Sequence, residues 1–222
     1  MEEAFWRDKW ATGQIGFHEG APNALLRKYG AKLGEGETAR GLRVLVPLCG
    51  KSADLAFLSS AGFAVTGVEL VRDAAAAFFS ENGVSAREEP WQGFPSLVGA
   101  GIRIATGNVF SLALPPAERF DVAYDRAALV AMKPEDRERY VGTLLAALRP
   151  GARLLLVSFH YEGGKMTGPP FSVSHEEVRR LFSSCEVDLL ESQDITDSEP
   201  RFRERGATFI AEDAWLITKP AA

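Results

Sequence analysis

From residue 42 onward, short apolar runs rich in β-branched residues alternate with longer segments of helical spacing. This alternation predicts parallel strands in one sheet, because each crossover helix returns the chain to the same edge. Helices are expected on both faces of such a sheet. The chain is therefore predicted to be an α/β protein with a doubly wound, mostly parallel, seven-stranded sheet. The expected strands are 42–46, 64–70, 102–106, 120–124, 153–158, about 187–195 and 213–218.

The two ends of the chain depart from this alternation. No helical pattern separates the last two expected strands, so they should form an antiparallel pair at one edge, with the last strand antiparallel. Before the sheet, helical patterns cover about 2–12 and 22–33. We expect one domain over 1–222, with 1–33 as a helical cover and 42–218 as a Rossmann-like core.

Charge and cysteine content narrow the class of partner. Lys and Arg number 25 against 30 Asp and Glu, a net charge of −5, which disfavours nucleic acid because a phosphate backbone needs a basic face. No apolar run approaches the ~18 residues of a membrane span, and the acidic start is unlike a signal peptide. Two cysteines fit a reducing compartment. We expect a cytoplasmic monomer with a small-molecule partner, no nucleic acid and no membrane.

Ligands of open α/β sheets bind beyond the carboxyl ends of the strands, so the residues there are the candidate ligand contacts. Gly50 lies in a tight turn after the first strand and lets the backbone approach a ligand closely. Glu69, about 20 residues later, ends the second strand, where a carboxylate can accept both hydroxyls of a ribose. The spacing fits neither a P-loop nor the three-glycine dinucleotide fingerprint. An adenosyl group without phosphates is thus favoured over NAD. The alternative is that Gly50 only serves the turn and that Glu69 is a solvated residue at a strand end.

Two further strand ends carry polar residues. Asn108 and Val109 follow the third strand, where an amide or a backbone N–H can address an adenine edge. Arg126 follows Asp125 after the fourth strand and lies over the expected cleft, where it can hold a carboxylate bidentately. The alternative is a surface ion pair with Asp125.

Aromatic residues and a glycine-rich loop suggest a cover for a flat, apolar ligand. Phe5, Trp6, Trp10 and Phe17 are dense for one helix and its exit, although packing on the core explains a pair such as Trp6 and Trp10 equally well. The loop 163–171 has the glycines and apolar tip of an active-site cover, or is an inert surface loop.

The sequence predicts no metal site and no familiar catalytic group. The three histidines, His18, His160 and His175, are scattered, and no paired-cysteine spacing exists. No nucleophile elbow or triad is present, so the catalytic residue stays unassigned.

Several ordered motifs along residues 5–218 resemble those of thiopurine S-methyltransferases. The motifs are Phe5-Trp6, Asp8-Lys9-Trp10, Gly16-Phe17-His18, Val46-Pro47-Leu48-Cys49-Gly50-Lys51-Ser52, Gly67-Val68-Glu69-Leu70, Tyr124-Asp125-Arg126-Ala127-Ala128-Leu129-Val130-Ala131 and Gly168-Pro169-Pro170-Phe171. The resemblance implies the class I methyltransferase fold, whose last strand is antiparallel, and S-adenosyl-L-methionine as the cofactor.

The resemblance also implies site residues. The cofactor residues are Trp10, Leu48, Glu69 and Arg126, with Asn108 and Val109 near the adenine. The substrate residues are Phe17, Pro169, Pro170 and Arg201. The chain departs from the family pattern at Asn108, near which many relatives carry an acidic residue. It departs again at Val71, where a Ser commonly stands, which moves the expected helix cap to Asp73.

The implied reaction is methylation of a thiopurine or another aromatic or heterocyclic thiol, with selenium or tellurium oxyanions as further acceptors. Opposite charges cancel in such a transfer, so alignment and exclusion of water matter more than a general base. Three alternatives stand beside it. They are a thiol or halide methyltransferase of the same fold, a nicotinamide oxidoreductase and a non-catalytic S-adenosylmethionine-binding protein. The oxidoreductase is disfavoured because this chain lacks the phosphate-binding glycines of that class.

Overall fold

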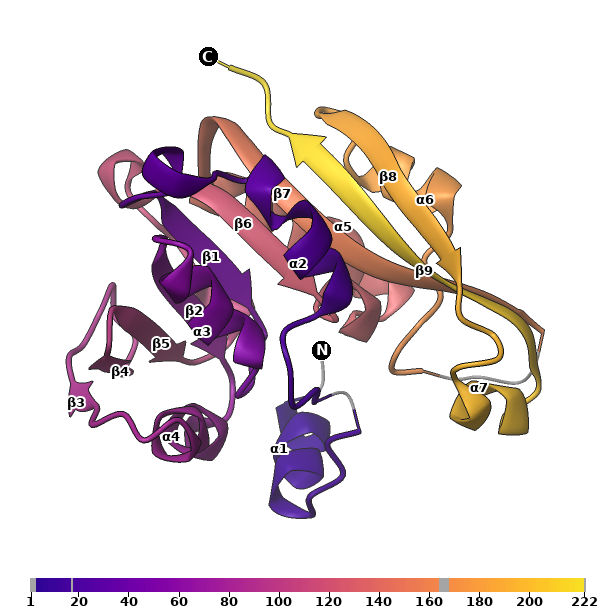
Figure 1. Ribbon diagram of the computed structural model, residues 1–222, viewed down its shortest axis with the longest axis horizontal. Coiled ribbons are helices and arrows are strands. Elements are labelled where there is room, and N and C mark those ends of the chain that lie inside the picture. Colours follow the sequence, from indigo (N-terminus) through magenta and orange to yellow (C-terminus); the bar gives the residue numbers. More distant parts are fainter. Residues whose placement is uncertain (1–2, 17, 164–167, 222) are drawn as a thin grey trace.

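The computed structural model describes residues 3–16, 18–163 and 168–221. Within them, nine strands form one sheet in the order β3-β4-β5-β2-β1-β6-β7-β9-β8 (Figure 1). The strands are β1 (Arg43–Pro47), β2 (Ala64–Glu69), β3 (Arg87–Glu88), β4 (Ser96–Gly99), β5 (Ile102–Thr106), β6 (Phe120–Arg126), β7 (Leu148–Gly163), β8 (Glu186–Asp194) and β9 (Ala207–Thr218).

Seven α-helices and five short 3-10 turns connect the described strands. The α-helices are α1 (Glu3–Ala11), α2 (Ala24–Tyr29), α3 (Ala53–Ser60), α4 (Arg72–Glu81), α5 (Pro134–Ala147), α6 (His175–Leu181) and α7 (Pro200–Glu204). The 3-10 turns are η1 (Gly30–Lys32), η2 (Gly36–Thr38), η3 (Val109–Ser111), η4 (Pro116–Glu118) and η5 (Leu129–Ala131). No helix in the described ranges is long and apolar enough to cross a membrane.

The topology confirms the predicted α/β class. Strands β5, β2, β1, β6 and β7 pair in parallel, and β9 pairs antiparallel with both β7 and β8. All seven expected strands are present in this arrangement. Two more, β3 and β4, extend the opposite edge antiparallel to β5, and their lengths of two and four residues are too short to produce a periodic signal.

Two buried clusters cover the two faces of the sheet. Leu25, Leu55 and Phe78 bring α2, α3 and α4 onto one face, and Tyr140 and Val178 bring α5 and α6 onto the other. Figure 1 shows α2 and α3 in front of the strands, with α5 and α6 behind them. Val141 and Leu144 of α5, which are spaced three residues apart, face the core in the same cluster.

The start of α4 corrects one expectation and introduces the site. The cap of this helix is Val71, whose side chain makes no capping bond, so the expected cap Asp73 is wrong and lies in the first turn instead. The Val71 N–H donates to Oε1 of Glu69 at 2.9 Å. The carboxylate that ends β2 therefore satisfies a free N–H of the helix, the role that a capping side chain usually has.

Parallel strands place their carboxyl ends at one edge of the sheet, where ligands bind in open α/β folds. In Figure 1 this edge is at the bottom, and both α1 and α7 lie beside it. The short helices at the two ends of the chain, far apart in sequence, therefore flank the same edge.

Candidate functional site

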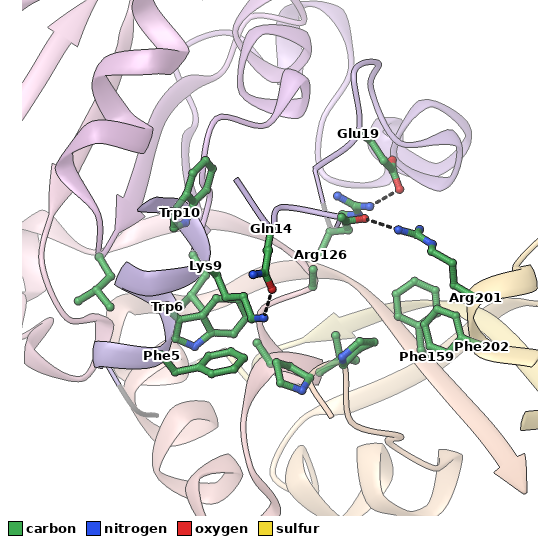
Figure 2. A pocket seen from close by; sticks show the side chains of 18 of the residues that line it. Phe5, Trp6, Lys9, Trp10, Gln14, Glu19, Arg126, Phe159, Arg201 and Phe202 are labelled. Carbon is green, nitrogen blue, oxygen red and sulfur yellow. Dashed lines mark hydrogen bonds and ion pairs between the residues drawn. The ribbon is translucent and has the colours of Figure 1, made fainter. Parts of the chain in front are cut away.

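A cavity of ≈ 440 Å³ opens at the carboxyl edge of the sheet, within the range typical of small-molecule sites. Three parts of the chain form its walls: α1 with the segment that follows it, the ends of β1, β2 and β6, and, opposite them, Phe159, Pro169 and Pro170 with α7 (Figure 2). The cavity therefore has a wall built on the sheet and a wall built on loops and short helices.

Glu69 is the acidic group of the sheet wall. It is only 6% exposed, and its two oxygens accept different backbone N–H groups: Oε2 that of Gly50 at 2.8 Å and Oε1 that of Val71 at 2.9 Å. Burial raises the pKa of Glu69, and hydrogen bonds from the backbone oppose this in part. The N–H of Leu70 also bonds to this carboxylate. A carboxylate has about four lone-pair sites, so it can still accept from a ligand in the cavity.

The turn after β1 brings its backbone against the cavity. Leu48 has φ 48°, a left-handed conformation that is rare for a residue with a side chain. Gly50 has φ 52°, and a Cβ there would lie 3.0 Å from Cζ2 of Trp10. Gly50 therefore permits the close approach that its sequence position predicts, and the group that approaches it in this structure is the Trp10 indole.

Arg126 ends β6 and lies on the cavity wall, where it forms an ion pair with Glu19 (Figure 2). The alternative of a surface ion pair with Asp125 is wrong because Asp125 is fully buried. The Asp125 carboxylate instead accepts the Tyr140 hydroxyl at 2.6 Å and the N–H of Ala128 at 3.1 Å. Burial raises the pKa of Asp125 to about 6, against the opposing effect of these bonds.

The aromatic residues of α1 face the cavity. Phe5, Trp6 and Trp10 all line it, and α1 has no buried residue. Trp6 and Trp10 also pack on a small cluster around Leu70 at the start of α4. Helix α1 is therefore held over the cavity by a few contacts, which favours the cover interpretation over packing in the main core.

The opposite wall contains the predicted prolines and a cation. Pro169 and Pro170 line the cavity, and the Tyr161 hydroxyl donates to the Pro170 carbonyl at 3.1 Å. Arg201 of α7 also lines it and donates to the Gly16 carbonyl at 3.4 Å (Figure 2). This bond joins the segment after α1 to α7 across the mouth of the cavity.

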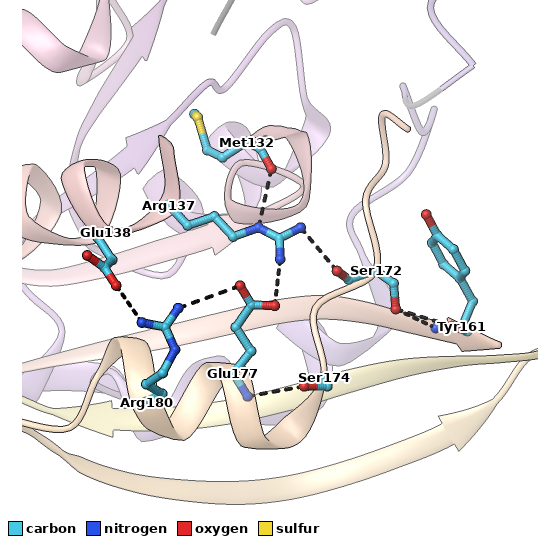
Figure 3. Close-up of polar contacts among 8 residues, drawn as sticks. All are labelled: Met132, Arg137, Glu138, Tyr161, Ser172, Ser174, Glu177 and Arg180. Atoms are coloured by element: carbon cyan, nitrogen blue, oxygen red, sulfur yellow. Dashed lines mark hydrogen bonds and ion pairs between the residues drawn. The ribbon is translucent and has the colours of Figure 1, made fainter. Parts of the chain in front are cut away.

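A buried arginine fixes the backbone behind this wall (Figure 3). Arg137 is 1% exposed and donates to the carbonyls of Met132 at 3.3 Å and Ser172 at 3.0 Å, while Nη1 pairs with Glu177 at 2.6 Å. The Ser172 hydroxyl accepts the N–H of Tyr161 at 2.9 Å. Arg137 thus links the start of α5 to the chain that follows the prolines.

The structure brings most of the predicted site residues to one cavity. Its walls include Trp10, Leu48, Glu69, Arg126, Pro169, Pro170 and Arg201. Asn108 and Val109 are not among the lining residues: the Asn108 amide donates to Glu3 Oε1 at 2.8 Å and its carbonyl caps η3, while Val109 is buried in the core. The predicted Phe17 and positions 164–167 of the cover loop lie outside the described residues.

Several lining residues had no distinct signal in the sequence. Glu19, Phe159, Phe202 and Arg205 line the cavity, as does Lys9. Phe159 lies beyond the expected end of its strand, because β7 continues to Gly163. Lys9 lies on α1, a predicted helix, but nothing in the sequence set this lysine apart. The remaining side chains come from irregular segments or from a five-residue helix, which periodicity does not detect.

Comparison with known proteins gives one consistent result. The family model for thiopurine S-methyltransferase matches residues 1–220. A thiopurine S-methyltransferase of Pseudomonas putida (strain W619) is 41% identical over 217 residues, covering 98% of this chain and 99% of that protein. One from Nitrosospira multiformis is 39% identical over 218 residues, covering 98% of each.

Solved structures add the fold. A Burkholderia thailandensis 1,6-didemethyltoxoflavin-N1-methyltransferase, with its substrate and S-adenosylhomocysteine bound, matches with a TM-score of 0.64 and 19% identity. The match covers 98% of this chain and 87% of that one. At this identity the likeness concerns the fold alone.

Proposed function

Because the chain belongs to the thiopurine S-methyltransferase family, we propose that its cavity binds a thiopurine, or another aromatic or heterocyclic thiol, next to S-adenosyl-L-methionine. The chain is an S-adenosyl-L-methionine-dependent S-methyltransferase. The observation that carries the proposed site is Glu69, a buried carboxylate that lies on the cavity wall at the end of β2.

The residues of the sheet wall fit an adenosyl cofactor. Glu69 would accept the two ribose hydroxyls, as an acidic residue does at this position in nucleoside-binding folds. Leu48 offers apolar surface, and the Trp10 indole offers a flat face beside the turn at Gly50. Arg126 offers a cation to a carboxylate group, because its partner Glu19 is 45% exposed and can move away.

The cofactor supplies a methyl group on a positively charged sulfur. The chain has to hold the acceptor sulfur in line with that methyl group and exclude water. Phe5, Trp6 and Trp10 give the cavity an apolar roof that does both. Aromatic thiols ionise readily, so no side chain of the cavity is required as a general base.

In this proposal the methyl acceptor binds against the wall opposite the sheet, which contains Phe159, Pro169, Pro170 and α7. Pro169, Pro170 and Phe159 offer flat apolar surfaces for a ring. Arg201 and Arg205 offer positive charge at the mouth, which favours a thiolate or another anionic group on the acceptor.

The remaining expectations belong to the same proposal. We infer that the chain acts as a single methyltransferase domain and as a monomer. Its two cysteines, Cys49 and Cys185, are both free thiols, which supports function in the cytoplasm, where thiols stay reduced.

The test is an acceptor screen with methyl-labelled S-adenosylmethionine. We expect label transfer to a thiopurine and to aryl thiols, and none to the matching phenols, whose oxygen is a weaker nucleophile at neutral pH. Selenite and tellurite form a separate arm. Transfer to phenols but not to thiols would contradict the proposal.

A further inference from the structure

Outside the cavity, the fold brings together three residues that the sequence keeps far apart. His160 lies on β7, Asp213 lies on β9, and His175 is the first residue of α6. Nδ1 of His160 lies 2.6 Å from Oδ2 of Asp213, and Nε2 of His175 lies 3.1 Å from Oδ1. None of the three lines the cavity. The scattered spacing that predicted no metal site conceals this cluster, because it forms only in the folded sheet.

We propose that His160, His175 and Asp213 form a binding site for a divalent transition-metal ion, Zn²⁺ in particular. The donor set is two imidazole nitrogens and one carboxylate oxygen, the combination that binds zinc and its neighbours rather than calcium or magnesium. The three donor atoms all lie within 4.8 Å of one another.

The carboxylate points to a bound cation. Asp213 is fully buried, and a buried carboxylate is costly unless charge or hydrogen bonds compensate it. Nδ1 of His160 compensates Oδ2 at 2.6 Å, which leaves Oδ1. Its Oδ1 and the Nε2 of His175 are both buried, and neither has a hydrogen-bond partner among the described residues, although they face each other. A metal ion would satisfy both atoms at once.

The donor atoms are spaced for zinc on the His175 side. Tetrahedral zinc with bonds of about 2.1 Å places its ligand atoms about 3.4 Å apart. Nε2 of His175 and Oδ1 of Asp213 lie 3.1 Å apart, close to this separation. Nδ1 of His160 contacts the other oxygen, Oδ2, at 2.6 Å, so the carboxylate or the imidazole would turn to bring His160 onto the same ion. The two imidazole rings already cross at 70° with centroids 4.6 Å apart, so they do not stack in parallel.

The two imidazole rings reach the surface, whereas Nε2 of His175 and Oδ1 of Asp213 are buried, so an ion would reach these atoms past the exposed parts of the rings. The side chains of His160 and His175 are 20% and 38% exposed, whereas that of Asp213 is not exposed. On the inner side, the His175 ring meets Trp215 edge-on with centroids at 5.0 Å. A bound ion would tie the start of α6, a few residues after Pro170, to β7 and β9.

The direct test is calorimetric titration of the metal-free protein with zinc, with cobalt as a spectroscopic probe. We expect one site per chain and a tetrahedral cobalt spectrum. His160→Ala and His175→Ala should each weaken zinc at least about tenfold, since even the loss of a group behind a ligand has that effect. His175 lies at a half-exposed helix start, so the fold should tolerate its replacement, and circular dichroism of each variant checks this.

Two controls make the result specific. His18→Ala removes the remaining histidine and should leave zinc affinity unchanged. Cys185→Ser removes the partly exposed thiol and should also have no effect. The absence of a saturable site in the native protein would overturn the proposal. So would zinc binding that survives His175→Ala and His160→Ala, or that disappears with Cys185→Ser.

Discussion

Replacing Glu69 by glutamine should weaken both the cofactor and the fold, because the carboxylate serves both. In the native protein each oxygen accepts one backbone N–H, from Gly50 and from Val71. An amide has only one oxygen, so its NH₂ group must face one of these donors. The change keeps the size of the side chain and alters only its hydrogen bonding.

The structure sets the size of both effects. One buried N–H loses its acceptor, which should lower the free energy of unfolding by about 1–3 kcal/mol. One ribose hydroxyl loses a charged acceptor, worth about 1.5–3 kcal/mol, which corresponds to about 10- to 150-fold in affinity. The matched control is Glu88→Gln, whose side chain is 70% exposed and pairs with Arg72, and which should change neither quantity measurably.

Calorimetric titration with S-adenosylhomocysteine measures the first effect, and urea unfolding without ligand measures the second. A pH series adds a further arm. Because burial raises the pKa of Glu69, native affinity should fall with decreasing pH already above the ordinary value of 4.5, and the glutamine variant should lack this step. Unchanged affinity in folded Glu69→Gln protein would refute the assignment of the ribose to this carboxylate.

Three further predictions concern the walls and their support. Since the pKa of Asp125 is about 6 in the fold against 3.8 ordinarily, its carboxyl contributes stability below pH 3.8 that is lost as the pH rises through 6, up to about 3 kcal/mol. Urea unfolding from pH 4 to pH 7 should therefore show native protein losing stability relative to Asp125→Asn, and equal pH slopes would show that the pKa is not raised. Arg201→Ala should leave S-adenosylhomocysteine affinity intact and slow methylation of a charged aryl thiol more than of a neutral one, whereas equal slowing would remove Arg201 from the acceptor side. Arg137→Met should lower the free energy of unfolding by about 3 kcal/mol, because it leaves two carbonyls without their donor and Glu177 with Arg180 alone, at 3.9 Å. The exposed Arg139→Met is its control on the same helix, and equal stabilities would mean that the buried bonds add nothing.

The fold was largely predictable because its signals are periodic. Each strand of the parallel centre is a short apolar run, and α5 repeats its apolar residues at helical spacing between Pro134 and Ala147. Strands β3 and β4 and helix α7 were not predictable, since two to five residues are too few to show a period. The cap of α4 was predicted at Asp73 because capping rules consider neighbours in sequence, whereas the group that bonds to Val71 is the last residue of β2.

The site was predictable where a residue ends a strand. Glu69 and Arg126 occupy such positions, and both reach the cavity. Asn108 also follows a strand, but its amide bonds to Glu3 in α1, a partner that strand order does not reveal. Motif resemblance supplied further residues, including Trp10 and Arg201, which line the same cavity.

The part of the site that could not be predicted from the sequence depends on long-range contacts. Glu19 reaches Arg126 across 107 positions of sequence, and Arg201 reaches Gly16 across 185. Neither pair has a local pattern, so only the folded chain shows that the segment after α1 and helix α7 close one mouth.

The residues at the ends of β1, β2 and β6 are proposed to bind an adenosyl group that carries no phosphates. One titration tests this binding most directly. Calorimetry of the native protein with S-adenosylhomocysteine, NAD and NADP compares the two cofactor classes at the same wall. We expect one tight site for S-adenosylhomocysteine, weakened in Glu69→Gln, and no binding heat from either dinucleotide. Saturable binding of NAD or NADP, with none of S-adenosylhomocysteine, would contradict it.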